Sequence, residues 1–249
     1  MSDLASISAD RLSVMPTRRG FRQRGMEMTR LETFTDAAFA FAVTLLVIGG
    51  SDSVPTNFDE MLLALKQVPA FAASFANIML FWYAHHIWSR RFGLEDTTSI
   101  LLSLFLIFVV LIYVYPLKAI YSGAIEFFSN GYFASYFGLR SLADLRDLFV
   151  IFGLGFAGLS GIIVLLNRHA WSLRDKLSLS ALELFDLQTE TTHWNINVIV
   201  AAISVGLALA LPDRWVVLAG IFYSVFAVVL PWHGIRRGRL RDRLHPAAG

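Results

Sequence analysis

TTSILLSLFLIFVVLIYVYPL, residues 97–117, is a run of the chain without a single charged side chain. A helix needs about 20 apolar residues to cross the hydrocarbon core of a bilayer, because each residue adds about 1.5 Å. A helix also pairs its backbone amides internally, which is necessary where no water is present. A water-soluble core does not require an apolar run of this length. The stretch therefore predicts a membrane-spanning helix in an integral membrane protein.

The composition of the whole chain indicates the same class. Of its 249 residues, 56% are hydrophobic and 16% are charged, and the mean hydropathy is +0.58. Soluble domains carry about 25% charged residues, so this balance excludes an ordinary water-soluble enzyme. The chain has no cysteine, which excludes a disulfide framework, a thiolate zinc site, an iron–sulfur cluster and a cysteine nucleophile.

Apolar runs long enough to span a membrane recur along the chain. We expect an all-α integral membrane protein with six transmembrane helices, over residues 31–50, 68–88, 97–117, 148–166, 192–211 and 215–232. Pro69 falls in the first turn of its run, and Pro116 and Pro231 fall near the ends of theirs, where a helix tolerates proline. The chain then divides into a basic N-terminal tail (1–30), a six-helix domain (31–232) and a basic C-terminal tail (233–249).

The lysines and arginines predict the orientation of the helices, since cationic loops stay on the cytoplasmic side. Sixteen of the 21 lie in the two tails and in the loops after the second and fourth spans, and five lie on the other side. An even number of spans puts both ends of the chain on one side. Both termini are therefore predicted to be cytoplasmic, in a multi-pass protein of the cell membrane.

Two of the connections are long and amphipathic. Residues 119–147, on the predicted outer side, interleave aromatic residues with charged ones, which is typical of a helix lying at the headgroup level. Residues 168–191 mix Arg and Lys with leucines. They predict a cytoplasmic amphipathic helix that packs on the bundle or the membrane, or that binds a partner.

Ionisable residues near the ends of the first two spans are a functional-site hypothesis, because charge inside a membrane is costly. Asp36 lies about two turns into the first span, and Glu32 precedes it by four residues on the same face. His85 and His86 lie near the end of the second span, which runs antiparallel to the first, so they share the depth of Asp36. We expect these groups, with Arg30 at the membrane edge, to form a hydrogen-bonded network that fixes the first helix against the second.

Two motifs in these spans resemble a known family. The first is Arg30-x-x-x-Phe34-Thr35-Asp36, followed by residues rich in Ala and Phe, and the second is Trp82-x-x-His85-His86. Together they resemble the transmembrane protein 175 family of bacterial and lysosomal potassium channels, over about residues 30–50 and 78–90. The resemblance implies a structural or gating role for a polar set formed by Arg30, Thr35, Asp36, Trp82, His85 and His86.

The resemblance also implies a homotetramer in which the first helix of each subunit lines a central pore. By offset from the aspartate, Phe41, Leu45 and Ile48 form an apolar constriction and Thr44 forms the selectivity layer. The family has no Thr-Val-Gly-Tyr-Gly carbonyl filter, and no such sequence occurs here. This chain departs from the family where Thr35 replaces a serine and where Phe41 replaces an aliphatic residue. We expect Phe41 to be the narrowest point.

The function expected from this resemblance is that of a potassium-preferring cation channel, with K⁺ as the permeant ion. The expected partners are further copies of the chain, monovalent cations and the lipid bilayer, and the expected location is a bacterial inner membrane. No enzyme activity, metal, cofactor or nucleic-acid partner is expected.

Other classes of membrane protein compete with a channel. A di-iron lipid enzyme needs many histidines, and the chain has six, of which only two are adjacent. A proton-coupled secondary transporter would relay protons through Asp36 and the histidines. This transporter and a non-conducting membrane protein stay open as alternatives.

Overall fold

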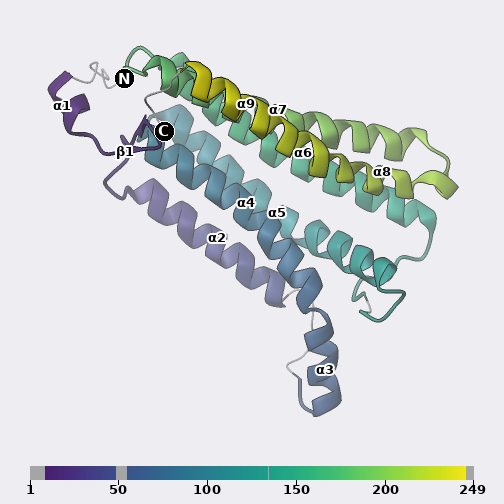
Figure 1. Cartoon of the computed structure of the whole chain (residues 1–249). Coiled ribbons are helices and arrows are strands. Elements are labelled where there is room, and N and C mark those ends of the chain that lie inside the picture. The colour runs from purple at the N-terminus through teal and green to yellow at the C-terminus, as the bar shows by residue number, and fades with distance from the viewer. Residues whose placement is uncertain (1–8, 49–54, 134, 245–249) are drawn as a thin grey trace.

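The computed structural model describes residues 9–48, 55–133 and 135–244 (Figure 1). This part of the chain is a bundle of long helices with one small β-hairpin. The helices are α1 (Ala9–Val14), α2 (Arg30–Ile48), α3 (Phe58–Lys66), α4 (Val68–Phe92), α5 (Thr97–Phe128), α6 (Leu142–Ser172), α7 (Ala181–Ala210), α8 (Val217–Ile221) and α9 (Phe226–Leu244). Short 3₁₀ turns, η1 (Asp213–Trp215) and η2 (Phe222–Val225), flank α8, and the strands are β1 (Thr17–Arg18) and β2 (Phe21–Arg22). The predicted all-α membrane class is confirmed.

The described helices fit the predicted number of membrane crossings. Five segments are long and apolar enough to cross a membrane: α2, α5, α6, α7 and the stretch Asp213–Leu244. The pair α3 and α4 passes the same test together, with a bend of 41° between them, and raises the number to six if the pair is one span. Pro69 follows the bend directly, at the start of α4, where its missing N–H costs no helical hydrogen bond.

The two long connections are mostly parts of the long helices, so the predicted separate amphipathic helices are wrong. α5 continues to Phe128, and α6 begins at Leu142. α6 in turn ends at Ser172, and α7 begins at Ala181. Helices of 30 to 32 residues measure about 45 Å, longer than a hydrocarbon core of about 30 Å. The polar residues of these stretches therefore belong to helix ends that continue beyond the apolar runs.

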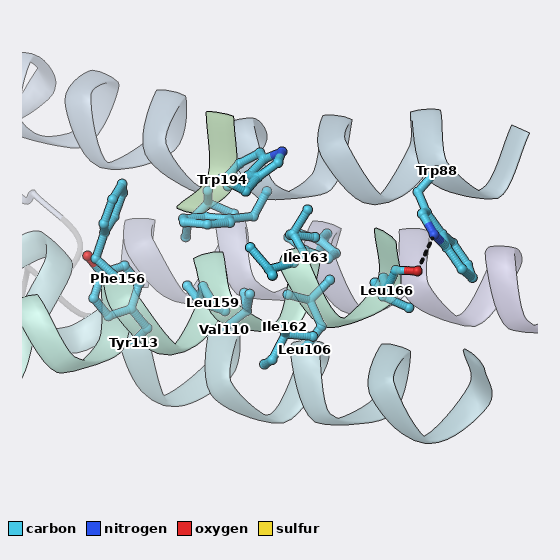
Figure 2. Close-up of a cluster of buried hydrophobic side chains, with 14 of the residues drawn as sticks. Trp88, Leu106, Val110, Tyr113, Phe156, Leu159, Ile162, Ile163, Leu166 and Trp194 are labelled. Atoms are coloured by element: carbon cyan, nitrogen blue, oxygen red, sulfur yellow. Dashed lines mark hydrogen bonds between the residues drawn. The ribbon is translucent and has the colours of Figure 1, made fainter. Parts of the chain in front are cut away.

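The core of the bundle lies between α4, α5, α6 and α7 (Figure 2). Phe156 of α6 packs edge-on against Phe81 of α4, with 5.5 Å between the ring centroids, and Phe81 also contacts Trp194 of α7. Gly155 lets α5 approach α6 closely, because a Cβ there would lie 2.3 Å from the ring of Tyr113. Small residues promote this kind of close helix contact in membranes.

The predicted N-terminal tail is a folded segment over its described residues. β1 and β2 pair as a hairpin whose turn, Arg19-Gly20, has φ of 52° and 79°, as a type I′ turn requires. Phe21 is buried, and its ring meets that of Phe92 edge-on at 5.7 Å. Downstream, the Gly25 N–H donates to the carbonyl of Arg90 at 3.1 Å. The segment therefore packs against the end of α4.

A buried ion pair ties the same segment to α7. The Arg24 guanidinium donates to both carboxylate oxygens of Glu183, at 2.9 and 3.1 Å, and the two side chains are 2% and 0% exposed. Glu183 also accepts from the backbone N–H groups of Arg22 and Ser180, at 2.9 and 2.8 Å. The second of these bonds completes a capping box at the start of α7. One carboxylate thus joins a helix cap to the N-terminal segment.

The predicted C-terminal tail is helical over most of its length, because α9 continues to Leu244. Arg237 Nε donates to Thr189 Oγ1 at 2.9 Å, and Arg241 Nε pairs with Asp186 Oδ1 at 2.9 Å. Both partners lie on α7, beside which α9 runs (Figure 1). These arginines therefore hold two helices together, in addition to the role in orientation that their number predicts.

Candidate functional site

Helix α2 lies at one edge of the bundle and contacts α4 and α5 on one side only (Figure 1). The buried face consists of Glu32, Thr35, Phe39, Ala42 and Leu46. The opposite face is exposed and carries Phe34, Ala37, Phe41, Thr44, Val47 and Ile48. The spacing of three and four residues makes this face one continuous stripe along the helix. We call it the free face of α2.

Three of the four predicted pore residues lie on the free face. Phe41 and Ile48 are 56% and 64% exposed, and Thr44 is exposed between them. Leu45 is half-buried and packs against the core at the margin of the face. The Thr44 hydroxyl donates to the carbonyl of Ala40 at 3.0 Å. The lone pairs of the hydroxyl oxygen point away from that bond and can accept a hydrogen bond.

Asp36 is bound by an indole and not by the predicted histidines. Trp82 Nε1 of α4 donates to Asp36 Oδ1 at 2.8 Å. The Trp82 ring stacks on that of His86, with 5.4 Å between centroids, because residues four apart share a helix face. The prediction that Asp36 is hydrogen-bonded to His85 or His86 is wrong: the larger tryptophan on the same face reaches the carboxylate.

His85 connects α4 to α5. Its Nε2 shares a hydrogen bond of 2.9 Å with Ser103 Oγ, and both side chains are buried. One residue is a rotation of about 100° on a helix, so His85 faces α5 while His86 faces α2. The two adjacent histidines therefore serve different contacts, and the predicted single network is in fact two separate ones.

The carboxylate of Glu32 pairs mainly with an arginine. The carboxylate is buried, with Oε1 at 3.4 Å from Arg90 Nε and 3.7 Å from His86 Nδ1. Arg90 also donates to the carbonyls of Gly25 and Met26, at 3.0 and 3.1 Å. It therefore joins α4, α2 and the segment that leads into α2. Neither sequence motif includes Arg90, although Arg90 follows His86 by four residues on the same face of the helix.

The remaining two members of the predicted polar set stay outside these contacts. The Thr35 hydroxyl is buried and donates to the carbonyl of Leu31 within its own helix, at 2.8 Å. Arg30 is exposed and forms no ion pair with any residue that the structure describes. Within the described residues of one copy of the chain, neither Thr35 nor Arg30 contacts the other members of the predicted polar set through a side-chain hydrogen bond or ion pair.

Lys118, which neither sequence motif includes, binds the far end of α2. Its ammonium donates to the carbonyl of Leu46 at 2.6 Å and lies 5.1 Å from the centre of the Tyr136 ring. The side chain is buried although it carries a charge. A cation is favourable at a helix C-terminus, where the last carbonyls lack partners. The signal in the sequence was a lysine placed directly after the apolar run 97–117.

These features define a multi-pass all-α membrane protein whose first spanning helix is tied down at both ends and leaves one face free. The family profile described as "Endosomal/lysosomal potassium channel TMEM175" matches residues 30–116. A potassium channel from Marivirga tractuosa is 33% identical over 223 residues, which cover 84% of this chain and 87% of that protein. The chain belongs to the TMEM175 family, and its class is that of a channel and not of an enzyme.

Two solved structures resemble the fold. A threonine-to-alanine variant of the potassium channel MtTMEM175, in complex with a nanobody–MBP fusion protein, superposes with a TM-score of 0.78 at 31% identity. It covers 91% of this chain and 99% of its own. A lysosomal potassium-selective channel TMEM175 homolog from Chamaesiphon minutus gives a TM-score of 0.55 at 19% identity, over 84% of this chain and 96% of its own. The second likeness concerns the fold alone.

Proposed function

We propose that the chain is the subunit of a homotetrameric, potassium-preferring cation channel whose pore is lined by the free face of α2. The relatives named above are potassium channels, which supports the ion. The single observation that supports the pore is the free face itself. A helix that lines an axis must present one continuous stripe to it, and α2 leaves such a stripe unpartnered along its whole length.

The side chains of the free face suit a pore without a carbonyl filter. Rings of Phe41 and Ile48 would gate by excluding water, and an ion passes an apolar ring only when the ring is wide enough for part of its hydration shell. The half-buried Leu45 would lie between neighbouring copies of α2 and complete the constriction from the side. Phe41 is the bulkiest of the three residues and is proposed as the narrowest point.

The Thr44 hydroxyl is the proposed selectivity layer. It lies one helical turn beyond Phe41 on the same face and holds its proton toward Ala40 O at 3.0 Å. With the proton engaged inside the helix, the oxygen of each copy can accept a bond or coordinate a cation. A ring of such oxygens would favour cations over anions and would replace part of the hydration shell of K⁺.

Three contacts on the back of α2 would hold the pore-lining face in place. Glu32 is fixed to Arg90 near the start of the helix, Asp36 to Trp82 one turn later, and Leu46 O to Lys118 at the end. Each contact joins α2 to α4 or α5. A rotation of α2 about its axis would break all three contacts together. This is the structural or gating role that we assign to the polar residues.

The proposed location is a bacterial inner membrane with both termini in the cytoplasm. The arginine-rich end of the bundle, where the N-terminal hairpin and α9 meet, would then face the cytoplasm. The cysteine-free chain permits a direct test with single cysteines and an impermeant thiol reagent. Gly138→Cys should be labelled from outside intact cells and Thr17→Cys should not; the reverse pattern would invert the orientation.

Planar-bilayer recording of the purified protein tests the channel. In a KCl gradient we expect unitary currents and a reversal potential near that of K⁺, without any countersubstrate. Phe41→Ala should raise unitary conductance, whereas Phe108→Ala, which truncates an equally exposed phenylalanine on α5, should not. Thr44→Val should shift the potassium-over-sodium reversal potential more than it changes conductance. Transport that requires a fixed stoichiometry of protons would instead favour a secondary transporter.

A further inference from the structure

A second site is formed where the N-terminal hairpin covers the end of the bundle. A cavity of about 450 Å³ lies between the hairpin and helices α4, α7 and α9. Ligand sites typically measure about 300 to 1,000 Å³. Its lining includes five arginines: Arg18, Arg19, Arg90, Arg91 and Arg241. Of these five, only Arg90 belongs to the contacts proposed for the pore.

Only part of this positive charge is neutralised. Arg241 pairs with Asp186 at 2.9 Å, and Arg91 Nη1 lies 3.6 Å from Glu190 Oε1. Asp242 is the third and last carboxylate of the lining. Arg90 is paired with Glu32, which lies outside the lining, so one positive charge of the lining is left in excess.

The excess positive charge lies on the hairpin. Arg18 and Arg19 are exposed, and neither side chain makes an ion pair or hydrogen bond with another residue of the described ranges. The turn that carries them is held over the cavity, because Arg241 Nη2 donates to the carbonyl of Arg19. Two free guanidinium groups thus face a cavity whose position is fixed by a third arginine.

A smaller, mainly apolar cavity of about 250 Å³ adjoins the first, and the two share Tyr83, Ile87, Arg91, Thr189 and Glu190. It extends along α4 to Leu80 and is walled by Ile163 and Trp194. Leu80 precedes Ile87 by two helical turns, so the apolar cavity reaches about 10 Å further into the bundle. The charged cavity thus continues into an apolar one that is directed toward the middle of the membrane.

We propose that the two cavities bind one anionic phospholipid, with its phosphate among the arginines and an acyl chain along Leu80, Tyr83 and Ile87. Guanidinium groups bind phosphate oxygens in a bidentate manner, and basic pockets between spanning helices are suited to anionic headgroups. A free phosphate would use only the charged cavity. The adjoining apolar cavity favours an amphiphile. The proposal holds whether or not the protein conducts ions.

Thermal unfolding of the full chain in detergent, titrated with phosphatidylglycerol, phosphatidylcholine or soluble glycerol 3-phosphate, tests the site. Phosphatidylglycerol should stabilise the protein saturably and more than phosphatidylcholine. Arg18→Gln combined with Arg19→Gln should weaken the apparent affinity about tenfold or more, the value of one charge-assisted hydrogen bond. The matched control combines Arg140→Gln with Arg214→Gln, two exposed arginines from the other end of the bundle, and should bind like the wild type.

A second variant tests the apolar cavity. Gly234 lines it, and a Cβ there meets no atom within 4 Å, so Gly234→Leu should fill the cavity while favouring the helix. It should abolish the advantage of lipid over glycerol 3-phosphate. Equal stabilisation by the two lipids would overturn the proposal, and so would equal behaviour of the arginine variant and its control. Stabilisation by glycerol 3-phosphate that matches the lipid would also overturn it, in favour of a soluble phosphate ligand.

Discussion

Replacing Glu183 with glutamine should weaken the packing of the N-terminal segment against the bundle. Glu183 is fully buried and accepts hydrogen bonds from the Arg24 guanidinium at 2.9 and 3.1 Å, and from the backbone of Arg22 and Ser180. Glutamine keeps the shape and one acceptor oxygen. Its amide group, however, would place hydrogens opposite the donors of Arg24, and the guanidinium would stay buried without a counter-charge.

The expected loss follows from that burial. Removing one partner of a buried ion pair costs about 3–5 kcal/mol, because the other charge is left uncompensated. Glu183→Gln should lower the free energy of unfolding by this amount, measured by equilibrium unfolding of the purified protein in mixed detergent micelles. Limited trypsin digestion should also cleave faster after Arg22 and Arg24, because the released segment is accessible.

The ion pair of Arg146 and Asp213 supplies a matched control. Asp213 is 51% exposed, and Arg146 also donates to the carbonyls of Ala208 and Leu211. Asp213→Asn should therefore cost less than about 1 kcal/mol. Adding Arg24→Met to Glu183→Gln should cost less than the sum of the single changes, since both remove the same pair. Additive costs, or a Glu183→Gln cost as small as the control, would refute the reasoning.

Three further predictions concern the ties of α2 and of α5. Trp82→Phe removes the donor to Asp36 and should cost about 1–3 kcal/mol of stability, more than Asp36→Asn, which keeps an acceptor oxygen; equal costs would contradict this. Lys118→Met leaves Leu46 O without its donor and should cost a similar amount, whereas Lys66→Met, on the surface beside Tyr132, should change little in the same unfolding assay. Burial opposes ionisation of Asp96, but hydrogen bonds from His169 and Ser99 hold its pKa below the usual value. The stability that the carboxylate provides is present above about pH 4 and is lost as the pH falls through the lowered pKa, so the advantage of the wild type over Asp96→Asn should vanish in acid.

The apolar runs were sufficient to predict the class of the protein. Burial in lipid demands a long run of apolar residues, and that pattern is local in the chain. The free face of α2 was also predictable in outline, because Phe41, Thr44 and Ile48 follow the period of a helix. The sequence could not distinguish the half-buried Leu45 from these exposed residues. Consecutive side chains differ by about 100° around the helix axis, and the packing at the margin of the free face depends on how α4 and α5 lie against α2.

The hydrogen-bond partners of the polar side chains were less predictable, because the depth of a residue in the membrane does not fix the direction of its side chain around the helix axis. Asp36, Trp82, His85 and His86 share a level in the bundle, and only the packed helices show that Trp82 faces Asp36 while His85 faces Ser103. The N-terminal segment was missed for another reason. Its one apolar anchor, Phe21, stands among arginines, and its counter-charge, Glu183, lies 159 residues from Arg24.

The central claim is that the free face of α2 lines the ion pathway, and cysteine accessibility tests it most directly. Thr44→Cys places a single thiol on that face of a cysteine-free chain. Ile151→Cys places one on the exposed side of α6. With single channels recorded in a planar bilayer, a small cationic methanethiosulfonate reagent should block the current of Thr44→Cys and leave that of Ile151→Cys unchanged. Unchanged current in Thr44→Cys, with block in Ile151→Cys, would contradict the assignment of the pore to α2.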